Sequence, residues 1–289
     1  VFRASRALTP EQIRTLSSEM AAADAEVLSV EPDLVMLPQW VPSDSQFASQ
    51  WHYYEAVGGI NLPAAWDRSL GAGVRVAVID TGYRPHADLA ANIVGGYDFI
   101  ADTATANDGN GRDADARDPG DWCSSSSSWH GTHVAGTIAA VTNNGLGVAG
   151  VAPSARIVPV RVLGTCGGYT SDIAAGVVWA SGGTVSGIPA NAYPARVLNL
   201  SLGGSGACGT TMQNAINSAR SRSAMLVISA GNSNTNASNA SPANCAGVIT
   251  VGATTRTGAR TSFSNYGSIV DVAATPACAC SAVTCAWAA

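Results

Sequence analysis

The stretch GVRVAVIDTG, residues 73–82, decides the fold of this chain. It is a short apolar run, rich in β-branched residues and bounded by glycines, and its last strand-like residue is Asp80. A run of this kind without polar alternation is typical of a strand buried on both faces of a sheet. Asp80 then stands at the carboxyl end of a buried strand, where a carboxylate can orient a base. Taken alone, it is more often an ordinary capping or turn aspartate.

Similar apolar runs recur along the chain, at residues 155–163, 195–203, 224–232, 247–254 and, more weakly, 268–274. Helix-length segments at 131–141, 170–180 and 211–221 separate several of them. This alternation predicts an α/β fold, a doubly wound three-layer parallel sheet with helices on both faces. Sites in such sheets lie at the carboxyl ends of the strands, which directs attention to Asp80, to residues 199–204 and to residues 231–232.

Composition excludes two classes of partner. Charged residues make up 12% of the 289 residues, the net charge is −5 and no basic stripe is present, so we expect no nucleic acid partner. No apolar run is long enough to span a bilayer, so we expect no membrane partner. Four of the seven cysteines are spaced through the chain and indicate two disulfides formed in an oxidising compartment. They are Cys123, Cys166, Cys208 and Cys245.

The first fifty residues read differently from the rest. Residues 8–20 carry the signals of a helix start, with Thr9 as the cap, Pro10 in the first turn and Gln12 completing a capping box. Residues 25–37 then predict a short strand. The following stretch, 38–51, is polar and interrupted by prolines, which predicts a linker.

Two more residues have a type and position suited to catalysis. His130 opens a helix whose small residues allow close packing, and Asn232 follows a strand, where its amide could donate to a developing oxyanion. The alternative for Asn232 is an ordinary turn residue. His133 is better explained as a structural histidine, because the spacing of His130 and His133 lacks the pattern of a zinc hydrolase. His52 and His86 lie in linker or loop segments and are expected to be structural.

Five motifs occur in an order that resembles the subtilisin-like serine proteases, or subtilases. They are VAVIDTG at 76–82, HGTHVAGT at 130–137, LNLSLGG at 198–204, SAGN at 229–232 and SFSNYG at 262–267. The resemblance implies a secreted, extracellular endopeptidase with an Asp-His-Ser triad. By it, Asp80 holds the imidazole of His130, His130 acts as general base and acid, and Asn232 is the oxyanion donor.

The same resemblance assigns the substrate-binding residues and predicts protein or peptide substrates. Ser201, Leu202 and Gly203 would pair with the substrate backbone as an added strand. Gly168 and Tyr169 would form the facing strand. Ser229, Ala230 and Gly231 would wall the main specificity pocket.

The family resemblance also implies structural calcium, Ca²⁺, held by oxygen ligands. These would come from Asp88, Thr142, Asn144, Leu146 and Val148, with Gln50 as a further candidate. The aspartate-rich stretch 107–122 could form a second calcium loop or a solvated acidic loop. The fold implied by the resemblance pairs Cys123 with Cys166 and Cys208 with Cys245, each bridge contributing about 2–4 kcal/mol.

By the resemblance, the chain divides into three parts. Residues 1–42 would be a partial inhibitory propeptide and linker, the propeptide being a partner of the protease. Residues 43–274 would be the catalytic domain, incomplete at its C-terminus, and residues 275–289 an aberrant tail. The family's Gly-Thr-Ser motif is expected after residue 274, where the chain instead reads TPACACSAVTCAWAA. A shifted reading frame or a natural truncation would explain this.

The serines present in the chain do not stand in the context that a nucleophile requires. They include residues 124–128, Ser262, Ser264 and Ser281. We therefore expect a secreted serine endopeptidase whose nucleophile is absent from this chain, or alternatively an inactive module that binds peptides in the strand groove. A third, weaker hypothesis is a metallohydrolase using His130 and His133. Without the family's next helix, the isolated chain is expected to fold poorly.

Overall fold

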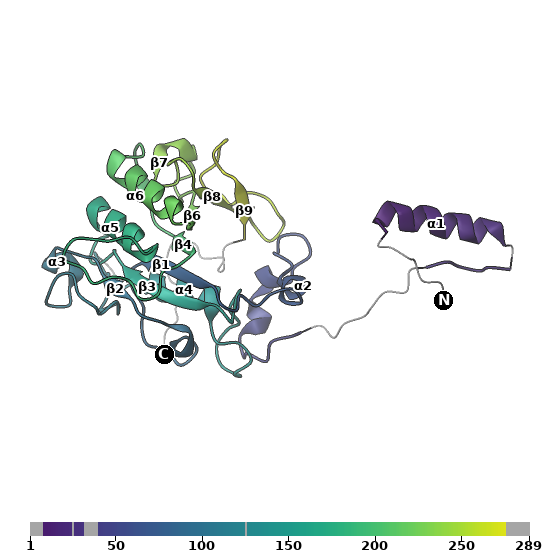
Figure 1. The fold of residues 1–289 in the computed structure, drawn as a ribbon, viewed down its shortest axis with the longest axis horizontal. Coiled ribbons are helices and arrows are strands. Elements are labelled where there is room, and N and C mark those ends of the chain that lie inside the picture. The colour runs from purple at the N-terminus through teal and green to yellow at the C-terminus, as the bar shows by residue number, and fades with distance from the viewer. Residues whose placement is uncertain (1–7, 25, 32–39, 125, 276–289) are drawn as a thin grey trace. The chain divides into compact units, whose positions relative to one another are not determined.

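The computed structural model describes residues 8–24, 26–31, 40–124 and 126–275. The chain divides into two compact units, Val1–Gln39 and Trp40–Ala289 (Figure 1). The segment of the predicted tail after Thr275 lies outside the described residues. Within the described residues, no helix combines the length and the apolar character needed to cross a membrane.

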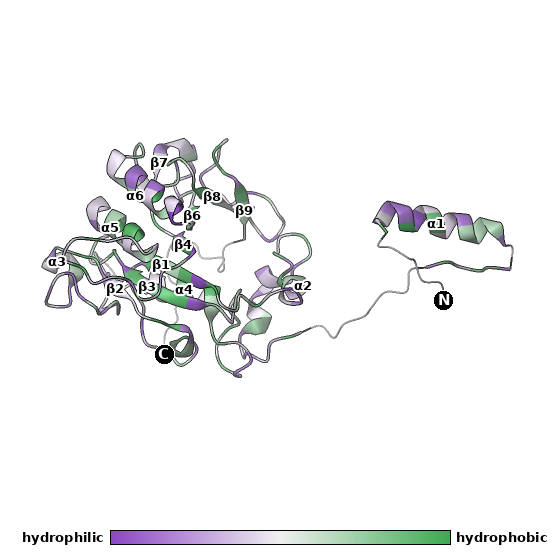
Figure 2. Ribbon diagram, in the orientation of Figure 1, coloured by the Kyte–Doolittle hydropathy of each residue, from purple (hydrophilic) through white to green (hydrophobic). Residues whose placement is uncertain are grey.

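The first unit contains one helix, α1 (Pro10–Ala23). Its start is a capping box, as predicted: Gln12 N donates to Thr9 Oγ1 at 3.2 Å, and Thr9 N donates to Gln12 Oε1 at 3.0 Å. Figure 2 shows hydrophilic and hydrophobic residues alternating in bands along this helix. Residues 26–31 form no strand, so the strand predicted at 25–37 is absent there. The rest of that segment lies outside the described residues.

The second unit is built on a seven-stranded sheet whose strand pairings are all parallel. In spatial order the strands are β2 (Tyr97–Asp98), β3 (Arg156–Arg161), β1 (Arg75–Asp80), β4 (Val197–Leu200), β6 (Met225–Ser229), β8 (Ile249–Ala253) and β9 (Val272–Ala274). Each of the six apolar runs identified in the sequence contains one of these strands, which confirms the α/β prediction. A separate antiparallel pair joins β5 (Gly204–Ser205) to β7 (Ala240–Ser241).

Helices cover both faces of the sheet. On β1, Ala77 and Ile79 pack in the cluster that contains α5 (Thr170–Ala180) and α6 (Thr210–Ser221). Val76 and Val78 pack in the cluster that contains α4 (His130–Ala139). Because successive side chains of a strand point to opposite faces, Asp80 belongs to the same side as Val76 and Val78. The alternation along β1 thus directs the Asp80 side chain towards α4.

The strand order places the crevice of the sheet beside β1. From β1 the chain proceeds to β2 and β3 on one side, and it then continues through β4, β6, β8 and β9 on the other. The connections therefore diverge at the carboxyl ends of β1 and β4, where α/β sheets bind their ligands. Asp80 and Ser201 come at or just after these two strand ends.

Residues 40–51, the described part of the predicted linker at 38–51, do not form a linker. Trp40 and Phe47 pack against a core cluster containing Tyr53 and Trp66. Gln50 is buried, and its side chain bonds Ala149 twice, with Nε2 donating to the carbonyl and Oε1 accepting from the amide, both at 2.8 Å. The linker prediction was wrong from Trp40 onward, because apolar side chains of this segment pack in a core and the polar side chain of Gln50 makes buried hydrogen bonds.

The remaining elements are short. They are the helices α2 (Leu62–Trp66) and α3 (Thr103–Ala106) and the 3₁₀ helices Phe47–Ser49, Trp51–Tyr53, Ala90–Asn92 and Ala237–Asn239.

His52 makes the fold sensitive to acid. Its side chain is buried, and neither ring nitrogen has a hydrogen-bond partner among the described residues. Burial, with a smaller contribution from the charge of His133, lowers the pKa of His52 to about 4. In the unfolded chain the pKa returns to about 6.5. Between pH 6.5 and about pH 4, His52 is protonated in the unfolded chain but neutral in the folded protein. The free energy of unfolding should therefore fall as the pH drops through this range.

We expect His52→Leu to lose that acid sensitivity. The free energy of unfolding of the wild type should fall by up to about 3 kcal/mol between pH 7 and pH 4, whereas that of the variant should fall much less. Urea unfolding at a series of pH values measures this. Parallel pH curves for wild type and His52→Leu would contradict the assignment.

Candidate active site

Asp80 and His130 are in direct contact. Asp80 ends β1 and is fully buried, and His130 is the first residue of α4. His130 Nδ1 lies 2.8 Å from Asp80 Oδ1 and 2.9 Å from Oδ2. Thr81 N also donates to Asp80 Oδ1, at 2.8 Å. The Thr81 amide therefore holds the carboxylate in place independently of the imidazole. The structure thus brings together Asp80 and His130, the two residues that the sequence singled out.

Gly131 makes this contact possible. A Cβ at this position would lie 2.2 Å from the Gly82 carbonyl oxygen, so a side chain there would push the start of α4 away from the end of β1. The Gly131 amide donates to Thr81 Oγ1 at 3.0 Å, and Thr81 Oγ1 in turn donates to Asp118 Oδ2 at 2.7 Å. Both Thr81 and Asp118 are buried. This chain of bonds ties the first turn of α4 to the strand that carries Asp80.

The surroundings of His130 raise the pKa of its imidazole and so make it a stronger base. Burial works against the charged imidazolium, but the hydrogen bond and charge of Asp80, aided by the charge of Asp121, outweigh it and raise the pKa of His130. With Nδ1–H donated to Asp80, the neutral ring carries its free lone pair on Nε2. The pair can therefore accept a proton at Nε2 and stabilise the imidazolium that forms.

A cavity of about 670 Å³ opens beside His130. Of the predicted substrate-binding residues, four line it: Gly168, Ser201, Leu202 and Gly203. Tyr169 adjoins Gly168 and is exposed. The apolar part of the lining comes from Leu163, Ile173, Leu202 and Met212. The cavity thus runs from the imidazole between the loop after β3 and the segment after β4.

The other predicted substrate residues lie outside this cavity. Ser229 ends β6, and Ala230 is buried, while Gly231 is half-buried and Asn232 is exposed. Because β6 is the neighbour of β4 in the sheet, this turn emerges at the same carboxyl edge as Ser201. The structure thus places the candidate oxyanion donor at the edge that carries Asp80, on the β6 side.

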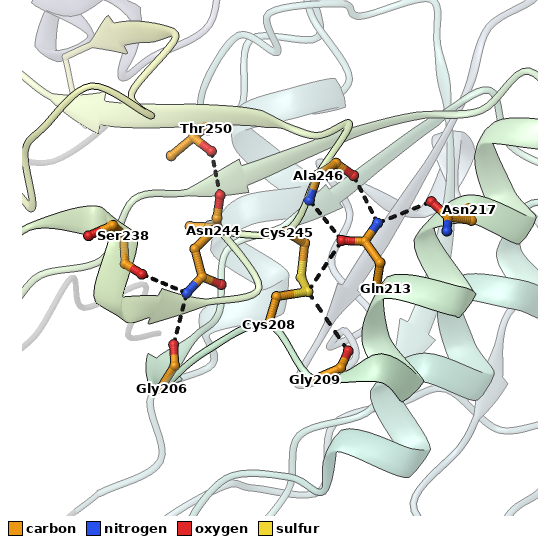
Figure 3. Close-up of a disulfide and its surroundings, with 11 residues drawn as sticks. Gly206, Cys208, Gly209, Gln213, Asn217, Ser238, Asn244, Cys245, Ala246 and Thr250 are labelled. Atoms are coloured by element: carbon orange, nitrogen blue, oxygen red, sulfur yellow. Dashed lines mark hydrogen bonds between the residues drawn. A yellow bond between two sulfur atoms is a disulfide. The ribbon is translucent and has the colours of Figure 1, made fainter.

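Two disulfides reinforce the walls of the cavity, and both pairs are the predicted ones. Cys123 bonds Cys166, which joins the segment before α4 to a cavity-lining loop. Cys208 bonds Cys245, close to β5 and β7 (Figure 3). Figure 3 also shows hydrogen bonds that cross-link the same two segments. In these, Gln213 bonds both the amide and the carbonyl of Ala246, and Asn244 Nδ2 donates to the carbonyls of Gly206 and Ser238.

The predicted calcium ligands also lie together. Asp88 is buried, and its carboxylate accepts from Asn144 Nδ2 at 2.7 Å and from Val148 N at 3.0 Å. Burial is the largest of the effects that raise the pKa of Asp88, and the charge of Asp44 adds to it. Asp44 is itself buried, with Oδ1 lacking a hydrogen-bond partner in the described structure. Two buried carboxylates, one with an orphaned oxygen, fit a cation site.

The aspartate-rich stretch 107–122 is organised by protein partners. Asp108 pairs with Arg161, Asp115 with Arg117, and Asp118 and Asp121 with hydroxyl groups. No three His, Cys, Asp or Glu side chains of the described residues converge as metal ligands would, either here or around His130 and His133. The donor set of a zinc hydrolase is therefore not assembled in this part of the chain.

Known proteins are similar to this chain in sequence and in fold. The model of the subtilase family matches residues 71–286, three quarters of the chain. This chain belongs to the subtilase family. An extracellular protease of Xanthomonas campestris pv. campestris is 56% identical to this subtilase over 284 residues. An extracellular basic protease of Dichelobacter nodosus is 46% identical over 274 residues. The solved structure of a protease from Pseudoalteromonas arctica is 62% identical, with a TM-score of 0.80.

The subtilase spans about half the length of these curated relatives. The matches cover 95% of the chain and 49% of the Xanthomonas protein, and 90% of the chain and 45% of the Dichelobacter protein. The match to the solved structure covers 82% of this chain and 72% of the other.

The sequence did not reveal three residues that the structure adds to the candidate sites. Asp118 supports Thr81, Asp44 lies beside Asp88, and Asn265 bonds the loop that carries Asn232. Asn265 falls within a recognised motif, which was the only available signal for it. Asp44 and Asp118 lie in segments interpreted as linker and acidic loop, and nothing local distinguishes them.

We expect Asp80→Asn to lower the pKa of His130. The substitution removes the charge that favours the imidazolium, while an amide of the same shape remains next to Nδ1. An NMR titration of the His130 ring measures the pKa. Asp115→Asn, in an exposed pair with Arg117, is the control and should leave the pKa unchanged. Equal midpoints for wild type and Asp80→Asn would show that Asp80 does not set the basicity of His130.

Proposed function

We propose that this subtilase is a secreted serine endopeptidase in which Asp80 and His130 are two members of a catalytic triad. The observation that carries the proposal is the hydrogen bond of His130 Nδ1 to the buried Asp80, at the rim of a peptide-sized cavity. The names of the extracellular relatives and the two disulfides support secretion.

In the proposed mechanism, His130 moves the proton. Nε2 takes the proton from a serine hydroxyl as its oxygen attacks the scissile carbonyl carbon, and then gives it to the leaving amine as the peptide C–N bond breaks. Water next replaces the amine and attacks the acyl carbon, losing a proton to Nε2, and Nε2 returns this proton to the serine oxygen as the acyl C–O bond breaks and the acid leaves. Asp80 holds the ring and compensates the imidazolium charge, so protonation at Nε2 costs less. Because His130 must be neutral to begin, its raised pKa moves the acidic limit of activity to higher pH.

The substrate is proposed to bind as an added strand. Ser201, Leu202 and Gly203 continue from the end of β4, and the loop at Gly168 and Tyr169 faces them across the cavity. A peptide laid between these segments would pair with backbone groups on both sides. Asn232 donates its side-chain amide to the oxyanion, and Ser229, Ala230 and Gly231 wall the pocket for the residue before the scissile bond. The N-terminal unit is proposed to be part of an inhibitory propeptide.

The serine nucleophile is proposed to come from residues other than the described ones. No serine hydroxyl of the described residues is hydrogen-bonded to the His130 ring. That same observation favours a second candidate function, in which the chain binds peptides without cleaving them.

A fluorophosphonate probe separates the two candidates, because it reacts with a serine that a neighbouring base has activated. We expect no adduct on the 289-residue chain and a stable adduct on a gene product that continues beyond it. His130→Ala should abolish that adduct and lower the peptidase rate by about 10⁴-fold or more. An adduct on the 289-residue chain would place the nucleophile within it. No adduct on either form, with peptide binding retained, would favour the binding module.

Structural calcium is the second part of the proposal. Asp88, the Asn144 side chain and the carbonyls of Thr142, Leu146 and Val148 would hold the ion, with Asp44 offering its orphaned oxygen. The carbonyls of these three residues accept no hydrogen bond from the described residues, so they are available as ligands. Bound Ca²⁺ would compensate two buried carboxylates and fix the 142–148 loop against the segment that contains Gln50.

We expect calcium to stabilise the protein and Asp88→Asn to remove that effect. At a hundred times its dissociation constant, a ligand adds about 2.7 kcal/mol to the free energy of unfolding. Thermal melts with excess Ca²⁺ and with EGTA measure the difference. Asp44→Asn should weaken the response, and the exposed Asp115→Asn should preserve it. A melting temperature indifferent to Ca²⁺ in wild type would rule the site out.

A further inference from the structure

The side chain of Asn265 bridges the loop that carries Asn232. Asn265 is 4% exposed. Its Nδ2 donates to the Ala230 carbonyl at 2.8 Å, and its Oδ1 accepts from the amides of Ser233 and Thr235, both at 3.0 Å. These bonds hold the main chain on both sides of Asn232, whose own side chain is exposed. One buried amide therefore fixes the turn that presents the candidate oxyanion donor.

The turn is shaped around this amide. The Asn265 backbone N–H donates to the Gly231 carbonyl at 2.9 Å. Gly231 has φ +101°, and a Cβ there would lie 2.5 Å from Asn265 Nδ2. Glycine is thus required both by the backbone conformation and by the close approach of Asn265. The residues around Asn265 add further backbone bonds, from Asn234 N to the Phe263 carbonyl and from Tyr266 N to the Thr235 carbonyl.

Asn265 uses both ends of its amide in this position. Oδ1 serves as acceptor for two backbone N–H groups, and Nδ2 serves as donor to a carbonyl. An aspartate has the same shape and retains the acceptor, but it turns the donor into an oxygen that faces the Ala230 carbonyl. Because Ser233 and Thr235 are exposed residues, water can satisfy their amides if the bonds are lost. Losing Asn265 should therefore loosen the turn rather than unfold the protein.

We propose that Asn265 is a positioning residue for the oxyanion donor, and that it acts only through Asn232. The inference rests on the proposed function of Asn232. A donor stabilises developing charge only if it is already held within a few tenths of an ångström of the required place. Asn232 lies on an exposed turn, and the bonds of Asn265 supply the rigidity that its own surroundings lack.

The experiment needs no nucleophile. Two peptides, acetyl-Ala-Ala-Ala-Leu with a free C-terminal carboxylate and the same peptide as a C-terminal carboxamide, are titrated into the full chain by NMR. The carboxylate places an anionic oxygen where the oxyanion would form, so wild type should bind it about tenfold more tightly than the carboxamide. Asn232→Ala should abolish this preference. Asn265→Asp should reduce it to a similar extent, and the double variant should lose no more than either single one.

Matched variants separate positioning from general damage. Asn234→Gly removes an exposed side chain of the same loop, which accepts from Arg260, and it should keep the preference, because glycine adopts the left-handed backbone of this position (φ +52°) without strain. Binding of the carboxamide peptide should be unchanged in Asn265→Asp, because the groove itself is untouched. Asn265→Ser, which is smaller and uncharged, should show the same loss, whether or not Asn265→Asp folds. It separates lost positioning from repulsion between the aspartate introduced in Asn265→Asp and the carboxylate of the peptide.

Each other outcome overturns the inference in a distinguishable way. A full preference in Asn265→Asp, with none in Asn232→Ala, would refute the role of Asn265 and leave Asn232 as the donor. Additive losses in the double variant would show that Asn265 acts independently of Asn232. No preference in wild type would refute Asn232 as the donor, and the positioning role of Asn265 with it.

Discussion

The close approach of Gly131 to the Gly82 carbonyl is the contact on which the site depends. Because no Cβ intervenes, the first turn of α4 lies directly against the end of β1. The Asp80–His130 hydrogen bond, the raised pKa of His130 and the position of the imidazole at the cavity all follow from this approach. Sheet geometry supplies the other half, since strand alternation turns Asp80 towards α4 and the strand order opens the crevice there.

Three buried aspartates of the second unit each have a different task. An ionised carboxylate is costly to bury without partners, so the groups around each buried aspartate indicate its role. Asp80 meets an imidazole, Asp118 meets a hydroxyl that braces a helix, and Asp88 meets amide donors beside another carboxylate. The neighbours of each aspartate therefore decide its role: Asp80 orients the imidazole, Asp118 holds the hydroxyl that braces α4, and Asp88 is a proposed ion ligand.

Much of the second unit could be predicted, because its signals are local or belong to strong motifs. Apolar runs revealed the six longer strands, and the motifs identified Asp80 and His130 and, through the family resemblance, both disulfides. The failures share a cause. Residues 40–51 look like a linker because their few apolar residues, such as Trp40 and Phe47, show no periodic spacing. The nearness of Asp44 to Asp88, and of Asn265 to Asn232, depends on long-range folding that leaves no local pattern.

The acidic loop between β2 and α4 carries its counter-charges on the chain itself. Arg161 is completely buried and pairs with Asp98 and Asp108, while Arg112 pairs with Asp172 at the start of α5. A guanidinium is attached to the backbone, so it cannot be extracted by a chelator or lost by dilution. The pairing of Asp98, Asp108 and Asp172 with arginines therefore needs no bound ion.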